Sequence, residues 1–310
     1  MSEGKYRLVT RSDFDGLVCA ALFRELGMVD EIKFVHPKDM QDGKIEVTNR
    51  DITANLPFVP GAYMVFDHHS SEANRIKDRG SNYVNDPKAP SAARVVFNHF
   101  GGANRFKKVS ELMMRAVDKA DSAQFTEKDI LEPEGWELLS FIMDSRTGLG
   151  RFKTFRVSNY TLMMDLVDHL LTRPVEEILS LPDVKERADL YRDHQIKFKE
   201  QVKRCSEVHG NLVVFDVRKE EIIYAGNRFV IYGMFPTCNI SINVIWGLQK
   251  QNVVFAVGKS IVNRTSKTNV GELCLKYGGG GHVAAGTCQV ETARADRVLK
   301  ELTAQINKDG

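Results

Sequence analysis

The sequence predicts an α/β protein in three parts: a mainly parallel N-terminal sheet with helices on both faces (residues 1–180), a helical connector (181–208) and a smaller C-terminal α/β domain (209–310). Strand-like and helix-like segments alternate over the N-terminal part, which is typical of a parallel sheet. From Pro133 to Val208 the pattern is almost purely helical, and strand-like runs then return. A length of 310 residues also suits about two domains, each with its own core.

The N-terminal elements follow from short apolar runs and from helix signals. Leu17–Leu26 has apolar residues at helical spacing, and Gly27 is placed to end that helix. Ser91 can cap a helix that runs toward Phe100. A further helix is expected at Val109–Lys119, and strands at Tyr6–Thr10, Glu31–Val35, Ile45–Thr48 and Ala62–Phe66.

The later elements follow in the same way. The helical stretch is expected to contain Pro133–Met143, Asn159–Leu171, Val175–Leu179 and Pro182–Val208. C-terminal strands are expected at Asn211–Asp216, Phe229–Ile231, Ile240–Ile245 and Val253–Val257. Helices at Val270–Tyr277 and Ala293–Asn307 complete the chain, with a glycine run between them.

Composition narrows the class of protein. Lys and Arg number 43 against 41 Asp and Glu, and a net charge of +2 excludes coating of DNA by bulk charge. No apolar run approaches the roughly 18–20 residues of a membrane span, and the first residues lack the apolar stretch of a secretory signal. The five cysteines form no CxxC pair, which argues against a disulfide framework or a zinc-thiolate site. We therefore expect a soluble cytoplasmic protein with free thiols.

Acidic residues follow several of the expected strands and helices. Asp13 and Asp15 lie in a turn after the first strand, where residues two apart can face one site. Asp51 follows the strand expected at Ile45–Thr48. The triplet Asp67-His68-His69 comes directly after another strand, at the sheet edge where open α/β sheets place ligands, and Asp118 and Asp121 lie at a helix end.

Carboxylates that converge on one edge would repel each other unless cations lay between them. Carboxylates with an imidazole suit Mn²⁺ or Mg²⁺, whereas a tight zinc site would favour Cys or several His. Two such ions about 4 Å apart would activate a water molecule for attack on phosphorus. The acidic residues therefore predict a metal centre for phosphoryl chemistry.

A glycine run supplies a second chemical feature. Gly278-Gly279-Gly280-Gly281-His282 allows backbone N–H groups to approach an anion closely, in a tight turn rather than a linker. Upstream, Arg264 offers a guanidinium suited to phosphate.

In this order the motifs resemble those of the DHH phosphoesterase superfamily with its DHHA1 domain. The resemblance rests on Ser12-Asp13-Phe14-Asp15-Gly16, Asp51, Asp67-His68-His69, Asp121 and the glycine run with His282, and it covers nearly the whole chain. It implies a catalytic DHH domain over residues 1–180 and a substrate-binding DHHA1 domain over residues 209–310. It also implies a two-ion centre, usually Mn²⁺ with Mg²⁺ as the alternative, and a homodimer formed through the first domain.

Carried over by position, the resemblance assigns roles to individual residues. Asp67 would orient His68, and His69 would contact the substrate phosphate. The implied catalytic residues are Asp67, His69 and His282. Asp121 is preferred over Asp118 because Asp121-Ser122-Ala123-Gln124-Phe125 resembles the family's Asp-Thr-Gly-Ser-Phe. The implied metal ligands are Asp13, Asp15, Asp51, His68 and Asp121, and the implied substrate-binding residues are His69, Arg264, Gly279, Gly280, Gly281 and His282.

One position departs from a branch of the family. Pyrophosphatase-like members have a histidine four residues before the first Asp, where this chain has Val9. The pattern is therefore closer to RecJ, with one metal ion less fully held by protein. This weakens the pyrophosphatase interpretation.

A basic and aromatic stretch bears on the substrate. Between Asp144 and Asp165 it carries Arg146, Arg151, Lys153 and Arg156 together with Phe152, Phe155 and Tyr160. Such a mixture either neutralises phosphates and stacks a base or is simply a solvated loop.

We expect a metal-dependent phosphodiesterase or phosphatase that acts on very short nucleotides, such as pGpG or pAp. The alternatives are an exopolyphosphatase and a catalytically weak nucleotide sensor. No membrane partner and no long duplex DNA are expected.

Overall fold

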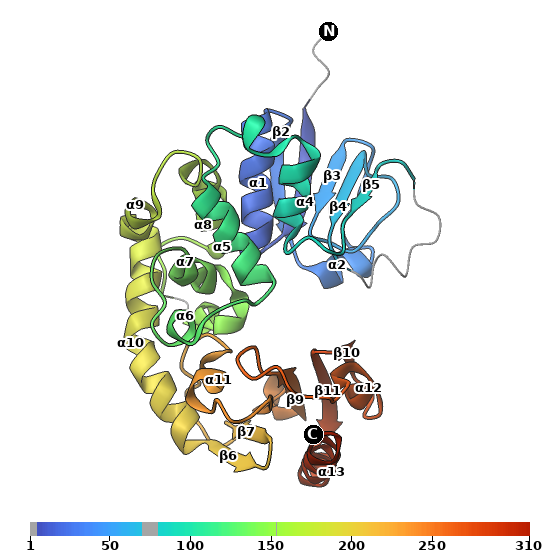
Figure 1. Cartoon of the computed structure of the whole chain (residues 1–310), viewed down its shortest axis with the longest axis vertical. Helices are drawn as coiled ribbons and strands as arrows, with labels where there is room; N and C mark the ends of the chain where they lie inside the picture. Colours follow the sequence, from blue (N-terminus) through green and yellow to red (C-terminus); the bar gives the residue numbers. More distant parts are fainter. Residues whose placement is uncertain (1–4, 70–79, 153) are drawn as a thin grey trace. The chain divides into compact units, whose positions relative to one another are not determined.

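Figure 1 shows the computed structural model of the chain, which describes residues 5–69, 80–152 and 154–310. The chain forms two compact units. The first unit comprises Met1–Gln124, Pro133–Ser145 and Leu149–Leu190, and the second comprises Phe125–Glu132, Arg146–Gly148 and Tyr191–Gly310. The chain passes between the units several times, and the last passage lies inside the long helix α10 (Pro182–Arg204). The boundaries expected at residues 180 and 208 stay a prediction.

The first unit contains a parallel sheet of five strands in the order β2-β1-β3-β4-β5. The strands are β1 (Tyr6–Arg11), β2 (Val29–Val35), β3 (Asp51–Ala54), β4 (Met64–Asp67) and β5 (Tyr83–Asn85). This confirms the predicted fold class. The strand predicted at Ile45–Thr48 is wrong, because Thr48–Arg50 turns and the strand starts at Asp51.

Helices α1 (Phe14–Leu26) and α2 (Pro37–Gln41) pack against opposite faces of strand β1. Gly16 in α1 lies so close to Thr10 that a Cβ atom there would stand 2.9 Å from the Thr10 hydroxyl. The neighbouring Val9 points to the other face, since side chains alternate along a strand, and it joins a small core with Met40 of α2. Both faces of the sheet are therefore covered near the centre.

The other helices among the described residues of the first unit are α4 (Ala92–His99), α5 (Glu111–Asp121), α7 (Gly135–Met143), α8 (Asn159–His169) and α9 (Val175–Ser180). Helix α1 contacts α4, α5 and α8 and forms the centre of this layer, as Figure 1 shows. Its first turn is capped by Asp13, and Gly27 ends it in the left-handed conformation, with a φ of 71°. The first turn of α1 and the last turn of α5 supply side chains to the site described below.

The second unit contains a six-stranded sheet in the order β10-β11-β9-β8-β7-β6. Only the β7–β8 pair is parallel among these described strands. The strands are β6 (Ser206–His209), β7 (Leu212–Asp216), β8 (Ile240–Trp246), β9 (Asn252–Lys259), β10 (Gly280–His282) and β11 (Ala285–Glu291).

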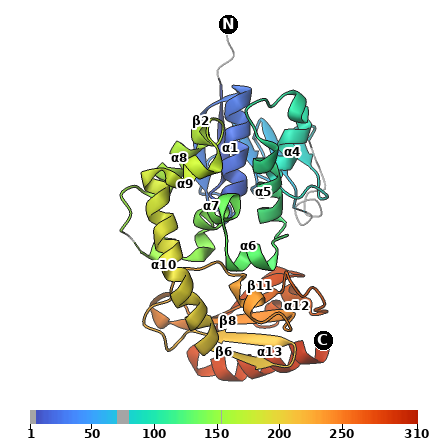
Figure 2. The same ribbon diagram turned by 60° about the vertical axis from the view of Figure 1, so that its left-hand side comes forward.

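Four helices belong to the second unit: α6 (Glu127–Leu131), α11 (Val230–Met234), α12 (Val270–Leu275) and α13 (Ala295–Asp309). Helix α13 packs Val298, Leu302 and Ile306 into the core of the sheet, and Figure 2 shows it beside the strands. The strand predicted at Phe229–Ile231 is wrong. Asn227 accepts a hydrogen bond from Phe229 N–H, and the chain turns there into α11.

Two expectations from composition can be compared with the fold. All five cysteines are free thiols, as predicted. Among the helices of the described residues, none combines the length and the apolar character that a membrane span requires.

Candidate metal centre

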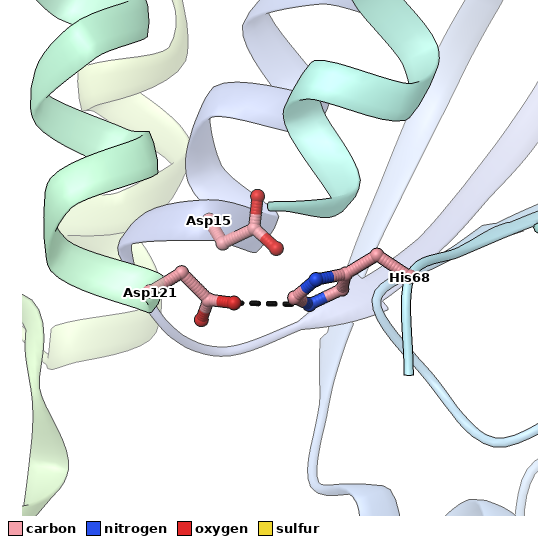
Figure 3. A group of neighbouring side chains, drawn as sticks. All are labelled: Asp15, His68 and Asp121. Carbon is pink, nitrogen blue, oxygen red and sulfur yellow. Dashed lines mark ion pairs between the residues drawn. The ribbon is translucent and has the colours of Figure 1, made fainter. Parts of the chain in front are cut away.

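Asp15, His68 and Asp121 meet at the carboxyl edge of the parallel sheet. Asp15 lies in the first turn of α1 after strand β1, His68 follows strand β4, and Asp121 is the last residue of α5. Each offers one ligand atom, and these three atoms lie within 4.8 Å of one another (Figure 3). The site thus gathers two carboxylates and one imidazole at the sheet edge where open α/β folds bind ligands.

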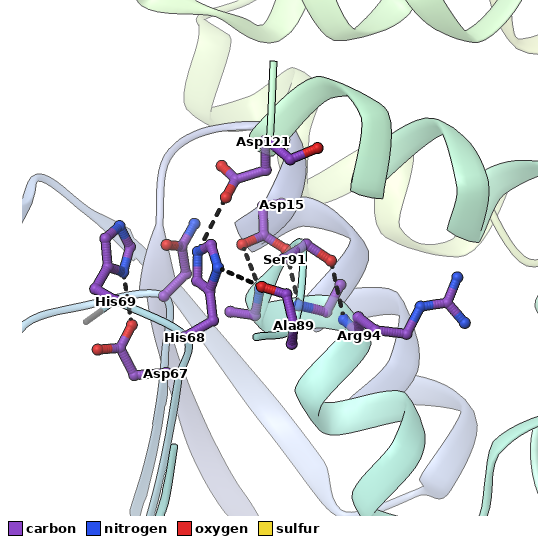
Figure 4. Close-up of polar contacts among 12 residues, drawn as sticks. Asp15, Asp67, His68, His69, Ala89, Ser91, Arg94 and Asp121 are labelled. Atoms are coloured by element: carbon purple, nitrogen blue, oxygen red, sulfur yellow. Dashed lines mark hydrogen bonds and ion pairs between the residues drawn. The ribbon is translucent and has the colours of Figure 1, made fainter. Parts of the chain in front are cut away.

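The carboxylate of Asp15 is held by the N-terminus of helix α4. Its two oxygens accept hydrogen bonds from the backbone N–H groups of Ala92 at 3.0 Å and Ala93 at 2.8 Å (Figure 4). The residue is 2% exposed. Burial and the neighbouring charge of Asp121 raise the pKa of Asp15 to about 8. The carboxylate therefore needs a positive partner to stay ionised at neutral pH.

The ring of His68 is fixed by a backbone carbonyl. Its Nδ1 lies 3.2 Å from Ala89 O, which can only accept, so Nδ1 carries a hydrogen and Nε2 faces the carboxylates. Nε2 is 2.9 Å from Asp121 Oδ2, an ion-pair distance without the alignment of a hydrogen bond. Burial would lower the pKa of His68, but the contact with Asp121 and the charge of Asp15 raise it to about 9.

Asp121 completes the group from helix α5. Burial alone would raise the pKa of its carboxyl, but the contact with His68 and the charge of that ring hold the pKa below its usual value. The donor set fits a divalent cation. Ala89 O holds Nδ1 of His68 so that Nε2 faces the carboxylates, and neither Asp15 nor Asp121 has a Lys or Arg ion pair in the described part of the chain.

Asp13 lies beside this group but is engaged elsewhere. It caps α1, with Oδ1 accepting from Gly16 N–H at 3.0 Å and from Asn55 Nδ2 at 3.2 Å. Its Oδ2 forms an ion pair with Arg11 Nε at 2.8 Å. The structure therefore brings Asp13 near the centre without adding it to the three-residue group.

Asp51 is a correction to the predicted ligand set. It begins strand β3 opposite Arg7, which binds its two oxygens at 2.6 and 3.0 Å, and Thr48 N–H donates to it at 2.6 Å. The amino end of a parallel strand lies at the edge opposite the metal centre, so the side chain cannot join it. Asn55, directly after β3, occupies the carboxyl end that Asp51 was expected to hold.

The predicted partner of Asp67 is also wrong. Asp67 is fully buried, and its Oδ1 lies 2.7 Å from Nδ1 of His69 rather than against His68 (Figure 4). Residues two apart in extended chain point to the same side, a signal that the sequence already carried. Contact with Asp67 raises the pKa of His69, whose side chain is 42% exposed.

Asp118, the alternative to Asp121, binds other side chains of the first unit. Its Oδ1 accepts from Ser91 Oγ at 2.7 Å and its Oδ2 accepts from Arg94 Nε at 2.8 Å. Ser91 is the N-cap of α4, so Asp118 secures the helix whose N–H groups hold Asp15. Asp121, not Asp118, is the residue of this helix end that lies with Asp15 and His68.

The glycine run adopts a structure that the sequence did not predict. Gly278 lies in a turn, and Gly280–His282 form strand β10, a hairpin partner of β11. A Cβ on Gly279 would stand 2.0 Å from Thr287 O, so the backbone packing itself requires glycine. His282 is exposed, with Nδ1 accepting from Ala284 N–H, and the exposed Arg264 donates to Ile261 O.

Two residues of the basic and aromatic stretch between Asp144 and Asp165 have partners within the first unit. Arg156 forms two hydrogen bonds to Asp183, at 2.9 and 2.7 Å. The buried Arg187 stacks on the Phe155 ring, with 4.2 Å between guanidinium carbon and ring centre. Arg156 and Phe155 thus have partners within the protein, and Lys153 lies outside the described residues.

The parallel sheet, with two carboxylates and an imidazole gathered at its carboxyl edge, defines the chain as an α/β protein with a candidate metal site. No family model and no curated protein matches the chain. Among solved structures, it is similar to the pGpG-specific phosphodiesterase PggH from Vibrio cholerae, at 59% identity over 99% of this chain and 100% of that one, with a TM-score of 0.89.

Two more distant structures share the fold alone. RecJ from Thermus thermophilus with Mn²⁺ is 13% identical, with a TM-score of 0.56, and the match covers 98% of this chain and 52% of RecJ. CDC45 from Entamoeba histolytica is 9% identical, with a TM-score of 0.51, over 97% of this chain and 95% of that one. The chain belongs to the DHH phosphoesterase superfamily, which confirms the resemblance found in the motifs.

Proposed function

We propose that this protein is a metal-dependent phosphodiesterase that cleaves very short nucleotides, with pGpG as its substrate. Similarity to a pGpG-specific phosphodiesterase along the whole chain carries the choice of substrate. The group of Asp15, His68 and Asp121 supports the type of chemistry, because hydrolysis of a phosphodiester needs an activated water and compensation for negative charge.

The metal-binding residues in this proposal are Asp15, His68 and Asp121. A bound divalent ion would lower the pKa of a water molecule and withdraw charge from the phosphate. The protein contributes orientation: the α4 N-terminus holds Asp15, and Ala89 O holds His68. We propose Mn²⁺ as the ion, since a mixed carboxylate and imidazole set suits it, with Mg²⁺ as the alternative.

His69 is the proposed contact to the phosphate. Asp67 accepts from its Nδ1, which leaves Nε2 to face solvent. The raised pKa of His69 favours a protonated ring, which can donate to a non-bridging phosphate oxygen or to the leaving oxygen.

The second unit is proposed to bind the remainder of the substrate through Arg264, Gly279, Gly280, Gly281 and His282. Exposure of the Arg264 and His282 side chains supports this assignment. A homodimer and a cytoplasmic location belong to the same proposal, and sedimentation of the purified protein would check the dimer.

One panel of assays tests the function. Purified protein with Mn²⁺ or Mg²⁺ is incubated with pGpG, pAp, a cyclic dinucleotide, single-stranded DNA and polyphosphate. We expect pGpG and water to yield two molecules of GMP, with Asp121→Asn abolishing turnover. Release of phosphate from polyphosphate without cleavage of any nucleotide would favour an exopolyphosphatase. Binding of pGpG without turnover would favour a sensor.

A further inference from the structure

Asn55 lies between the strands that deliver the metal-binding residues. It directly follows β3, which stands between β1 and β4 in the sheet, and these neighbours lead into Asp15 and His68. Its side chain is 1% exposed. Its backbone has a φ of 56°, a left-handed conformation that Asn tolerates better than most residues. A buried carboxamide therefore occupies the central position of this sheet edge.

The orientation of the carboxamide is set by Asp13. Nδ2 of Asn55 lies 3.2 Å from Asp13 Oδ1, an oxygen that also accepts from Gly16 N–H. An oxygen in the place of Nδ2 would face another acceptor, so the amide cannot be turned over. Oδ1 of Asn55 therefore points away from Asp13. Within the described parts of the chain this buried oxygen has no hydrogen-bond partner.

A buried carbonyl oxygen without a partner is unfavourable, and its surroundings limit what the partner can be. The neighbouring strand ends lead to carboxylates, which cannot donate a hydrogen bond when ionised. A cation is a suitable partner, because carbonyl oxygens are good ligands for Mn²⁺ and Mg²⁺. The unpaired oxygen thus indicates a ligand at the edge where Asp15, His68 and Asp121 meet.

The net charge of the side chains at this sheet edge matches that of a single divalent ion. Asp15 and Asp121 supply two negative charges, while His68 and Asn55 are neutral as ligands. Asp13 is already paired with Arg11. Two negative charges compensate one divalent ion, whereas the carboxylate predicted at the β3 end would have added a third.

We propose that Asn55 is a ligand of the ion bound by Asp15, His68 and Asp121, through its Oδ1 atom, and that the protein without substrate holds one divalent ion tightly. The inference rests on the metal centre of the proposed function. It adds a neutral oxygen donor where the sequence had predicted a carboxylate.

Titration with Mn²⁺ tests this inference without an activity assay. Free Mn²⁺ is measured by electron paramagnetic resonance for the wild type, Asn55→Gly, Asn55→Asp, Asn82→Ala and Asp121→Asn. Glycine and aspartate both tolerate the left-handed backbone at position 55. Asn82 is the matched control, because its carboxamide binds Ala62 O before strand β5, at the opposite end of the same sheet.

We expect one tightly bound ion per chain in the wild type and in Asn82→Ala. Asn55→Gly should raise the dissociation constant for Mn²⁺ about ten-fold or more. Asn55→Asp should bind Mn²⁺ at least as tightly as the wild type. In Asn55→Asp the new carboxylate faces Asp13 Oδ1, so Mn²⁺ should raise its melting temperature more than that of the wild type.

Three outcomes would distinguish a failure of the inference about Asn55 from a failure of the proposed metal centre. Wild-type affinity in Asn55→Gly, together with lost binding in Asp121→Asn, would overturn the role of Asn55 and leave the metal centre standing. Equal loss of affinity in Asn55→Gly and Asn55→Asp would mean that the residue is structural rather than a ligand. A wild type that binds no Mn²⁺ would remove the metal centre itself.

Discussion

Nδ1 of His69 lies 2.7 Å from Oδ1 of the fully buried Asp67, so the first acid of the triplet orients its third residue. Asn85 Nδ2 approaches the other oxygen of Asp67 at 3.4 Å. A buried acid that binds one ring nitrogen fixes the direction in which the other nitrogen points. Asp67 therefore contacts His69, while His68 lies with Asp15 and Asp121, which agrees with separate roles for the two histidines in the proposed function.

The first prediction concerns this pair. Asp67→Asn should lower kcat for pGpG by about 10–100-fold, the usual effect of losing a group that orients a functional histidine, while Mn²⁺ affinity changes little. The kinetics are compared with a Mn²⁺ titration of the same variant. If affinity for Mn²⁺ fell in parallel with kcat, Asp67 would be supporting His68 instead.

The second prediction concerns the effect of bound Mn²⁺ on the free energy of unfolding. Mn²⁺ at about 100 times its dissociation constant should add about 2.7 kcal/mol to the free energy of unfolding, because the ion compensates Asp15 and Asp121 only in the folded protein. Chemical unfolding is followed with Mn²⁺ and with a chelator. Asp121→Asn should remove the difference, and an unchanged difference in that variant would place the ion elsewhere.

The third prediction tests the correction to Asp51. Asp51→Asn should leave Mn²⁺ affinity unchanged but lower the free energy of unfolding by about 1–3 kcal/mol at neutral pH, since the charged pair with Arg7 is lost. Burial opposes ionisation of Asp51, yet Arg7 and Thr48 outweigh it and hold its pKa below the usual value.

The pH dependence of that effect has a definite sign. The pKa of Asp51 is depressed in the folded state, so its stabilisation is complete above the unfolded value of about 3.8 and is lost as pH falls through the folded pKa. Unfolding of the wild type and Asp51→Asn is therefore compared from pH 7 downward. The two stabilities should converge below pH 3.8, and a constant gap would contradict the assignment.

The fourth prediction concerns the glycine run. Gly279→Ala should destabilise the second unit by about 1–3 kcal/mol, because its Cβ would meet backbone atoms of Thr287 and Cys288. Gly280→Ala is the matched control, since a Cβ there meets nothing within 4 Å, and its stability should change by less than about 0.5 kcal/mol. Thermal unfolding measures both, and equal stability of the two variants would exclude the backbone clash.

Part of the site was predictable from residue order. Asp15 follows the first strand, His68 follows a strand that was correctly expected, and Asp121 ends a predicted helix. The position of Asp51 was not predictable. The four-residue strand β3 begins at that residue, and a shift of a few positions moves an acid from one edge of a sheet to the other.

By itself the sequence determined the α/β class and the family, because periodicity and motif order are properties of the chain. Only the tertiary structure decided which polar atoms face the centre. Asp13 forms an ion pair with Arg11 and Asp118 with Arg94, whereas the buried Oδ1 of Asn55 has no hydrogen-bond partner among the described residues. The physical reason is that a carboxylate can bind a cation only where nearby guanidinium and N–H groups have not already paired with it, and those groups come from segments far apart in the sequence.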